Sequence, residues 1–257
     1  MGLNLPIRGN ERLGEVVTRI DASVRLSTLW AASNVMVIDR MHINDHGPVH
    51  IKIITNIALK LLRLLIAGGV SPSVVADHNL TPEDAEVIVV LASVLHDIGH
   101  VVHRHKHEEL SLILAPPLIR ELLTGLYPEE PATVLEGEVL HAIHAHRREI
   151  APLTVEAGVV KVADALDMEA GRARIPFTAG EPTIHSVSAM AIKKVRIMKG
   201  DERPVKIHVE MSNSAGIFQL DNLLREKLKR SGIAPYFEVI GEILGEEKKI
   251  VERYTIE

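Results

Sequence analysis

Histidine is concentrated in three short segments of this 257-residue chain. Eleven of the fourteen histidines lie there: His42, His46 and His50; His96, His100, His103, His105 and His107; and His141, His144 and His146. Imidazole is a neutral metal ligand and general base near pH 7, whereas solvated surfaces are usually built from Lys and Glu. A fold that brings the three segments together would gather ligands around a divalent metal. We therefore expect metal-assisted hydrolysis.

The amino-acid composition limits the functional class, the types of metal ligand and the cellular location expected for this chain. The hydrophobic content of 46% is ample for buried cores, and a net charge of -5 with 3% aromatic residues disfavours a nucleic-acid binder. The absence of cysteine excludes disulfides, thiolate ligands and a cysteine nucleophile, which leaves nitrogen and oxygen ligands. No apolar stretch reaches the roughly 18 to 20 residues needed to span a bilayer, and residues 1–15 lack a signal-peptide core. We expect a cytoplasmic protein without a membrane partner.

Apolar periodicity predicts helices from residue 11 to about residue 170. Thr81-Pro82-Glu83-Asp84 is typical of a helix start, with Thr as N-cap and acids in the first turn. The expected helices span residues 11–30, 48–67, 82–97, 106–124, 131–146 and 153–170. The first part of the chain is therefore predicted to be all-α.

The pattern changes after Gly171, where Gly, Pro, Ser and Thr become frequent. Residues 204–211 alternate with period two, as in a half-buried strand. Strands are also expected at 191–198, 236–244 and 248–256, with a helix at 218–230. We predict a boundary near 185, which separates an all-α domain (1–184) from a small α+β domain (185–257).

The small domain contains no cluster of acids and imidazoles, so we expect it to hold no catalytic group. Dimerisation or regulation is the favoured role, and it makes a homo-oligomer the expected assembly. Ligand sensing is the alternative, with residues 213–216 as an anion-binding helix start.

Four residues in the helical part suit one metal ion. His50 falls early in its helix, His96 and Asp97 end another, and Asp164 lies within the apolar run VVKVADALD. A buried carboxylate must be paired or bound to metal, because burying it alone costs several kcal/mol. Two imidazoles and two carboxylates can form an octahedral site with positions open for water and a phosphate oxygen.

These residues, in the order H…HD…D, resemble the signature of the HD phosphohydrolase superfamily. The stretches HIKIITNIALKLL, LASVLHDIGH and VVKVADALD match as well, and the resemblance covers roughly residues 45–175. It implies a mainly α-helical bundle that binds one or two divalent ions (Mn²⁺, Fe²⁺, Co²⁺, Ni²⁺, Mg²⁺ or Zn²⁺). It also implies hydrolysis of a phosphomonoester or phosphodiester of a small nucleotide-like substrate by metal-activated water. The alternative is a module that binds metal and nucleotide for signalling, without turnover.

The stretches HEELSLILA and AIHAHRREIAPLTVEAGVVKVADALDMEAGRAR are most similar to the HD domain of ribonuclease Y and related phosphodiesterases. Those branches have two further histidine ligands, which map onto His107 and His146. The resemblance thus implies a two-metal site bridged by Asp97. His103 or His105 could replace His107, and His144 could replace His146. We find no GXXG clamp for RNA, so ribonuclease activity is not carried over.

Several residues are candidates for contact with the substrate. Where many relatives have a lysine, this chain has His100, which we assign to catalysis with Asp97 and Lys161. Lys161 lies three residues before Asp164, hence on the same helix face, and could meet a phosphate or form a plain salt bridge.

Other assignments are less specific. Arg172 and Arg174 are candidate phosphate clamps, or they compensate a helix C-terminus. His46, one turn before His50, is expected to line the pocket and bind substrate. His42 and His141 are expected on exposed helix surface, and Asp167 could pair with an arginine.

Overall fold

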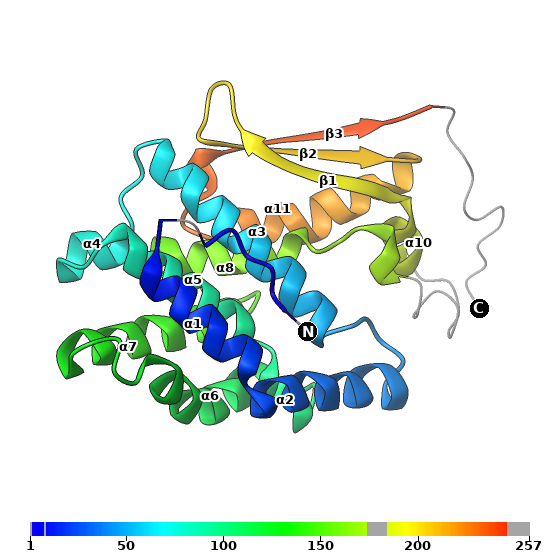
Figure 1. Cartoon of the computed structure of the whole chain (residues 1–257). Coiled ribbons are helices and arrows are strands. Elements are labelled where there is room, and N and C mark those ends of the chain that lie inside the picture. Colours follow the sequence, from blue (N-terminus) through cyan, green and yellow to red (C-terminus); the bar gives the residue numbers. More distant parts are fainter. Residues whose placement is uncertain (1, 8, 174–183, 246–257) are drawn as a thin grey trace.

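The computed structural model describes residues 2–7, 9–173 and 184–245. Within these ranges a bundle of α-helices carries a small sheet on one side, which confirms the mainly α-helical fold with a small α+β part (Figure 1). The helical part comprises α1 (Glu11–Ala22), α2 (Val24–Asn34), η1 (Val35–Arg40), α3 (Pro48–Ala67), α4 (Ser73–His78), α5 (Pro82–Leu95), η2 (Ile98–Val101), α6 (His107–Leu123), α7 (Glu129–Ala145), α8 (Val155–Leu166) and η3 (Ala170–Ala173).

Helix α5 lies at the centre of the bundle. All its residues from Asp84 to Leu95 are buried, and α1, α3, α7 and α8 pack around it. A helix that is apolar on every face belongs in a core. It begins as predicted, because the Thr81 hydroxyl accepts a hydrogen bond from the Asp84 amide and the Asp84 carboxylate accepts one from the Thr81 amide. Its buried end carries His96 and Asp97 into the interior.

The single helix expected at residues 11–30 is wrong. Ser23 lies between α1 and α2 with an extended backbone, and its hydroxyl accepts a hydrogen bond from the Leu26 amide at 3.2 Å. Serine is a preferred N-cap, so it starts a new helix where apolar periodicity alone suggests continuation. Helix α2 then passes into the π-helical stretch η1, which leads toward α3.

Helix α10 (Ile184–Ala191) leads into a three-stranded sheet of β1 (Ile192–Lys199), β2 (Val205–Met211) and β3 (Phe237–Ile243). Strands β1 and β2 are antiparallel, with Ile197 opposite Ile207, whereas β2 and β3 are parallel, with Val205 opposite Phe237. The three strands agree with those predicted at 191–198, 204–211 and 236–244. The fourth predicted strand, at 248–256, lies outside the described residues.

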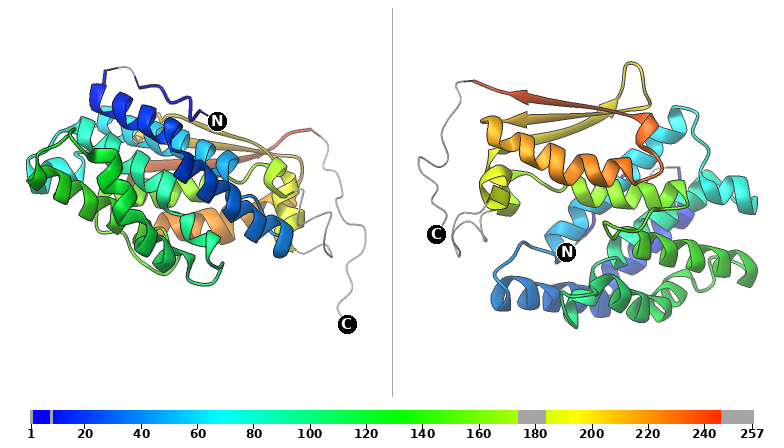
Figure 2. Two further views of the ribbon diagram at one scale, coloured as in Figure 1. Left: turned by 60° about the horizontal axis from the view of Figure 1, so that its bottom comes forward. Right: turned by 180° about the vertical axis from the view of Figure 1, so that it is seen from behind.

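The connection from β2 to β3 covers one face of the sheet. It contains η4 (Ser214–Gly216), η5 (Gln219–Leu224), α11 (Arg225–Lys229) and η6 (Ala234–Tyr236), so the helix predicted at 218–230 is a π-helical stretch continued by a short α-helix. Seen from behind, this helical segment runs between the sheet and α8, and both η5 and α11 contact α8 (Figure 2). Parallel strands require such a crossover.

Buried apolar side chains form one continuous cluster through both parts of the described chain. The cluster includes Leu91 of α5, Val160 of α8, Val209 of β2 and Phe237 of β3. Strands β1 and β2 also contact α3. The division at residue 184 and the homo-oligomer stay predictions. Among the helices described, none is long and apolar enough to cross a membrane.

We predict that Gly99→Ala destabilises the protein by about 1–3 kcal/mol, the usual cost of forcing extra atoms into a packed core. A methyl group at Gly99 would contact the backbone carbonyl of His107 and the backbone amide of Ser111. The control is Gly137→Ala, because Gly137 is an exposed residue of α7 with no atom within 4 Å of the added carbon. That control should gain up to about 1 kcal/mol of helix stability. Urea unfolding would measure both, and equal stabilities would contradict the prediction.

Candidate metal centre

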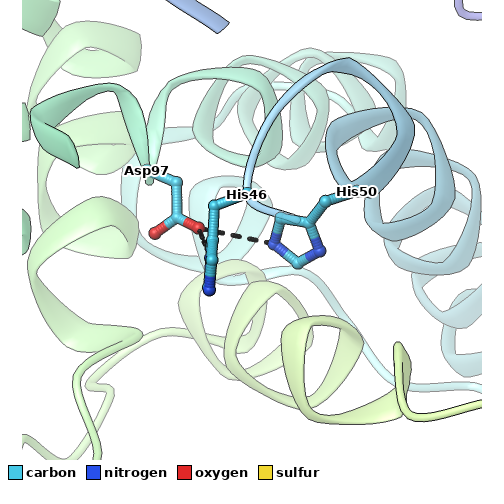
Figure 3. A group of neighbouring side chains, drawn as sticks. All are labelled: His46, His50 and Asp97. Carbon is cyan, nitrogen blue, oxygen red and sulfur yellow. Dashed lines mark hydrogen bonds and ion pairs between the residues drawn. The ribbon is translucent and has the colours of Figure 1, made fainter. Parts of the chain in front are cut away.

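Five segments of the chain meet at the carboxylate of Asp97. It lies two residues after the end of α5, directly before η2, and is only 3% exposed. Its neighbours come from the loop before α3 and the first turn of α3 (His46 and His50), from the end of α5 and from η2 (His96 and His100), from the first turn of α6 (His107), from the end of α7 (His146) and from α8 (Asp164). Figure 3 shows His46 and His50 directed toward one oxygen of Asp97.

The chain before α3 is fixed by a short network of side chains. The Asp45 carboxylate accepts hydrogen bonds from the amides of Gly47 and His50, at 3.0 and 3.3 Å. The Asn34 amide group donates to Asp45 at 2.9 Å and accepts from the His46 backbone at 3.0 Å. A side chain at Gly47 would contact Asn34, so the tight approach requires glycine. This network sets the positions of His46 and His50.

Each oxygen of Asp97 faces a different set of imidazoles. The Oδ2 atom lies 2.6 Å from His46 Nδ1, 3.3 Å from His96 Nε2 and 3.4 Å from His50 Nε2. The Oδ1 atom lies 3.2 Å from His107 Nε2, 3.6 Å from His100 Nε2 and 3.7 Å from His146 Nε2. Asp164 joins the first set, because its Oδ1 lies 3.6 Å from His50 Nε2 and 3.9 Å from His96 Nε2. The two oxygens of Asp97 therefore face two separate sets of possible ligand atoms.

Four of these histidine rings have their Nδ1 atom on an acceptor outside the cluster. The Nδ1 atom of His50 contacts the Asp167 carboxylate at 2.6 Å, and those of His96, His107 and His146 contact backbone carbonyls at 2.9, 3.0 and 2.5 Å. An acceptor at Nδ1 keeps the proton there and leaves the Nε2 lone pair directed at the cluster. Such outer contacts are typical of histidines that bind metal. Asp167 therefore orients His50, and its pairing with an arginine stays a prediction.

The donor set fits a divalent cation. Groups of three side chains that could hold an ion include His50 with His96 and Asp164, and His96 with Asp97 and His146. Within the described residues the buried Nε2 atom of His96 makes no hydrogen bond, which is costly unless a ligand occupies it. Imidazole and carboxylate together suit Mn²⁺, Fe²⁺, Co²⁺, Ni²⁺ or Zn²⁺.

The carboxylates and imidazoles of the cluster shift the pKa values of one another. Burial disfavours the ionised form of Asp97, but the imidazoles around it, His96 first, outweigh burial and hold its pKa well below the usual range. In turn, Asp97 overcomes burial at His96 and raises the pKa of that ring. Burial and the neighbouring His96 lower the pKa of His146. Asp164 has a pKa well below the usual range because Lys227, His96 and His50 overcome its burial.

His100 is a buried neutral imidazole in contact with Arg104. Burial, together with His46 and His107, lowers the pKa of His100 to about 2, against the opposing effect of Asp97. The Arg104 guanidinium donates a hydrogen bond to its Nε2 at 3.1 Å, so this lone pair is engaged. Arg104 therefore brings the positive charge that His100 lacks, and the sequence patterns did not identify it.

The structure distinguishes among the alternative histidines. His107 and His146 both reach Asp97. His103 and His105 are exposed. Among the described residues, His144 belongs to none of the groups of side chains that could hold a metal ion. His42 is exposed as expected, but it lies in the loop between η1 and α3 and not on a helix. The half-buried His141 differs from its expectation, because its Nε2 accepts a hydrogen bond from the Leu153 amide at 3.0 Å.

Lys161 is placed away from the pocket, in contrast to the role assigned from its spacing to Asp164. Its side chain is fully buried, and its ammonium donates to the carbonyls of Ala145, Arg147, Arg148 and Ile150. Spacing along a helix fixes a face but not the direction of a long side chain. Lys161 therefore closes the turn that carries His146.

The side chains of the two candidate arginine clamps lie outside the described residues, so their role as clamps stays a prediction. Arg172 belongs to η3, but its side chain is not among those described, and Arg174 lies outside the described residues. A different cation is found at the site. The Lys227 ammonium, from α11, forms an ion pair with Asp164 Oδ2.

A pocket of about 680 Å³ opens onto the cluster. This volume lies within the range usual for small-molecule sites. Polar lining residues include His46, Asn44, Arg104, Glu108, Arg147, Arg148, Gln219 and Lys227, and apolar ones include Met41, Ile43, Met168 and Leu223. His46 thus lines the pocket, and its contact with substrate stays a prediction.

Comparison with known proteins agrees with this geometry. Residues 52–169 match the family model of the HD domain. The chain is also 45% identical to the uncharacterized protein MJ1020 of Methanocaldococcus jannaschii over 232 aligned residues. This alignment covers 90% of this chain and 89% of that protein. The chain therefore belongs to the HD-domain family of metal-dependent phosphohydrolases.

We predict that Asp97→Ala abolishes metal binding while the protein stays folded. Removing the carboxylate takes away a ligand shared by both sets of imidazoles and the charge that favours a cation there. Elemental analysis of the purified variant would measure the loss, and circular dichroism would check the fold. Asp221→Ala is the control, because Asp221 is an exposed carboxylate paired with Arg225. Full metal content in Asp97→Ala would refute the assignment.

A second prediction concerns the number of ions. Loss of the His146 ligand should reduce the metal content of His146→Ala from about two ions per chain to about one, because two-metal sites hold their ions about 3.5 to 4 Å apart with separate ligands. His144→Ala is a matched control two residues away on α7, outside the candidate groups. Isothermal titration with Mn²⁺ would count the sites. A single site in the wild type would rule out the second ion.

Proposed function

We propose that this protein is a metal-dependent phosphohydrolase that hydrolyses a phosphomonoester or phosphodiester of a nucleotide-like substrate. The observation that carries the proposal is the position of Asp97 between two sets of imidazoles, with the Nε2 atoms of His50, His96, His107 and His146 directed toward its carboxylate. This donor arrangement opens onto a pocket large enough for a nucleotide. Family membership supports the reaction class, and the substrate is our inference.

The side chains divide into two ligand sets. In the proposal, His50, His96 and Asp164 would hold one ion, His107 and His146 would hold a second, and Asp97 would be a ligand shared by both. Ions bound there offset the charge of the phosphate and lower the pKa of water. His46 holds Asp97 through the hydrogen bond to Oδ2, and Asp167 holds His50.

The pocket lining supports an organic phosphate. Guanidinium groups of Arg104, Arg147 and Arg148 line it beside the cluster and match phosphate geometry. The Arg147 guanidinium also forms ion pairs with the carboxylates of Glu109, at 2.8 Å, and Glu149, at 3.0 Å.

The rest of the lining suits a nucleoside. Met41, Ile43, Met168 and Leu223 supply apolar surface for a base or sugar. The buried Oδ1 atom of Asn44 has no hydrogen bond within the described residues, so it can accept one from a ligand N–H or O–H.

A panel of nucleoside monophosphates, cyclic nucleotides and bis-p-nitrophenyl phosphate tests the proposal, with Mn²⁺, Co²⁺, Ni²⁺, Mg²⁺ or a chelator added. We expect metal-dependent turnover that His96→Ala lowers by about 100-fold or more, because a ligand is lost. The exposed His103→Ala should keep the wild-type rate. Metal and nucleotide binding without turnover by any member of the panel would contradict an enzyme and favour a signalling module.

A further inference from the structure

One face of the crossover segment between β2 and β3 lines the metal pocket. Gln219, Leu223 and Lys227 occur at four-residue intervals and all three line the pocket. Residues four apart lie on the same side of a helix. This segment therefore forms part of the pocket wall, together with the loop before α3 that supplies Met41, Ile43 and Asn44.

Close packing holds this wall against α8. The backbone carbonyl of Ser231 approaches Gly158 so closely that any side chain there would contact it, and Ile233 packs at the same point. Both Ser231 and Ile233 are buried. The Arg148 guanidinium adds a bond of 3.4 Å to the carbonyl of Asn222. The crossover is therefore fixed to the helix that carries Asp164.

Lys227 meets Asp164 on the side away from the imidazoles. Its ammonium pairs with Oδ2, whereas Oδ1 faces His50 and His96. The lysine side chain is 21% exposed, so it is neither buried in the core nor free in solvent. Asp164 can thus keep one oxygen for a metal ion while the other holds a cation at the edge of the pocket.

The cluster consequently has a cation at each end. Arg104 lies beside His100 and His107, in the set that faces Asp97 Oδ1. Lys227 lies beside Asp164, in the set that faces Asp97 Oδ2. Lys161, which has the spacing for such a role, is tied to four carbonyls instead.

We propose that Lys227 contacts the phosphate of the substrate from the Asp164 end, opposite Arg104, so that the crossover segment is part of the active site. The inference rests on the proposed phosphohydrolase function. A lysine ammonium is a compact point charge with three donors, so one can remain on Asp164 while another reaches a phosphate oxygen. The competing role is purely structural, in which Lys227 only orients Asp164 for metal.

The full-length variant Lys227→Met distinguishes contact with phosphate from a purely structural role. The control is Lys229→Met, because Lys229 is an exposed lysine on the same short helix. Each purified protein is loaded with Mn²⁺, its metal content is measured, and inorganic phosphate is titrated by calorimetry. We expect unchanged metal content in both variants, and a phosphate Kd raised about tenfold or more in Lys227→Met alone, the usual worth of one charge-assisted hydrogen bond. Lys227→Arg, which keeps the charge, should recover most of the affinity.

The inference is overturned if Lys227→Met binds phosphate as the wild type does, or if it loses metal in proportion to phosphate. Phosphate that binds the metal-loaded wild type too weakly to measure would overturn it as well. Kinetics on a substrate that the wild type hydrolyses should show a raised KM in Lys227→Met. Turnover in the wild type with no effect of this variant rejects the role of Lys227 and leaves the proposed function intact. Phosphate binding that depends on Lys227, without turnover, rejects the function and retains the contact.

Discussion

The buried charge of Asp97 is the constraint on which the rest of the structure depends. An isolated carboxylate in a protein interior costs several kcal/mol, and here it lies at the end of a helix with no polar face. Six imidazoles from α3, α5, η2, α6 and α7 surround it. The packing of the bundle therefore has to bring the ends of these helices to one point, and a bound cation would balance the charge further.

Helix ends are suited to this task because their backbone groups lack partners within the helix. His96 and His146 directly follow α5 and α7, and each ring contacts the carbonyl three residues earlier, from Ser93 and Ile143. His107, at the start of α6, uses the carbonyl of Arg104 in the same way. In all three cases, the same hydrogen bond from Nδ1 provides a partner for a backbone carbonyl and orients a candidate metal ligand. The Nε2 atoms then point inward without a dedicated side-chain network for every ring.

Local signals made much of this predictable. The capped start of α5, the strands and the ordered set His50, His96, Asp97 and Asp164 follow from periodicity and motif order, which neighbouring residues determine. The break at Ser23 was missed because apolar spacing continues across it, although serine is itself a cap signal. Lys161 was misplaced because a long side chain on the expected face turned toward carbonyls. The family resemblance selected His107 and His146 among neighbouring histidines, and in the structure both lie within 4 Å of the Asp97 carboxylate.

Lys227 could not be identified from sequence, because 63 residues separate it from Asp164 and no motif surrounds it. Its position follows from topology. A parallel β2–β3 pair needs a crossover, and the helix of that crossover must bury its apolar face. It does so between the sheet and α8, and α8 carries Asp164 (Figure 2). The sheet thus contributes to the pocket through its connection, while the candidate metal ligands among the described residues all belong to the helical bundle. Changes in the crossover can therefore alter the lining of the pocket without changing those ligands.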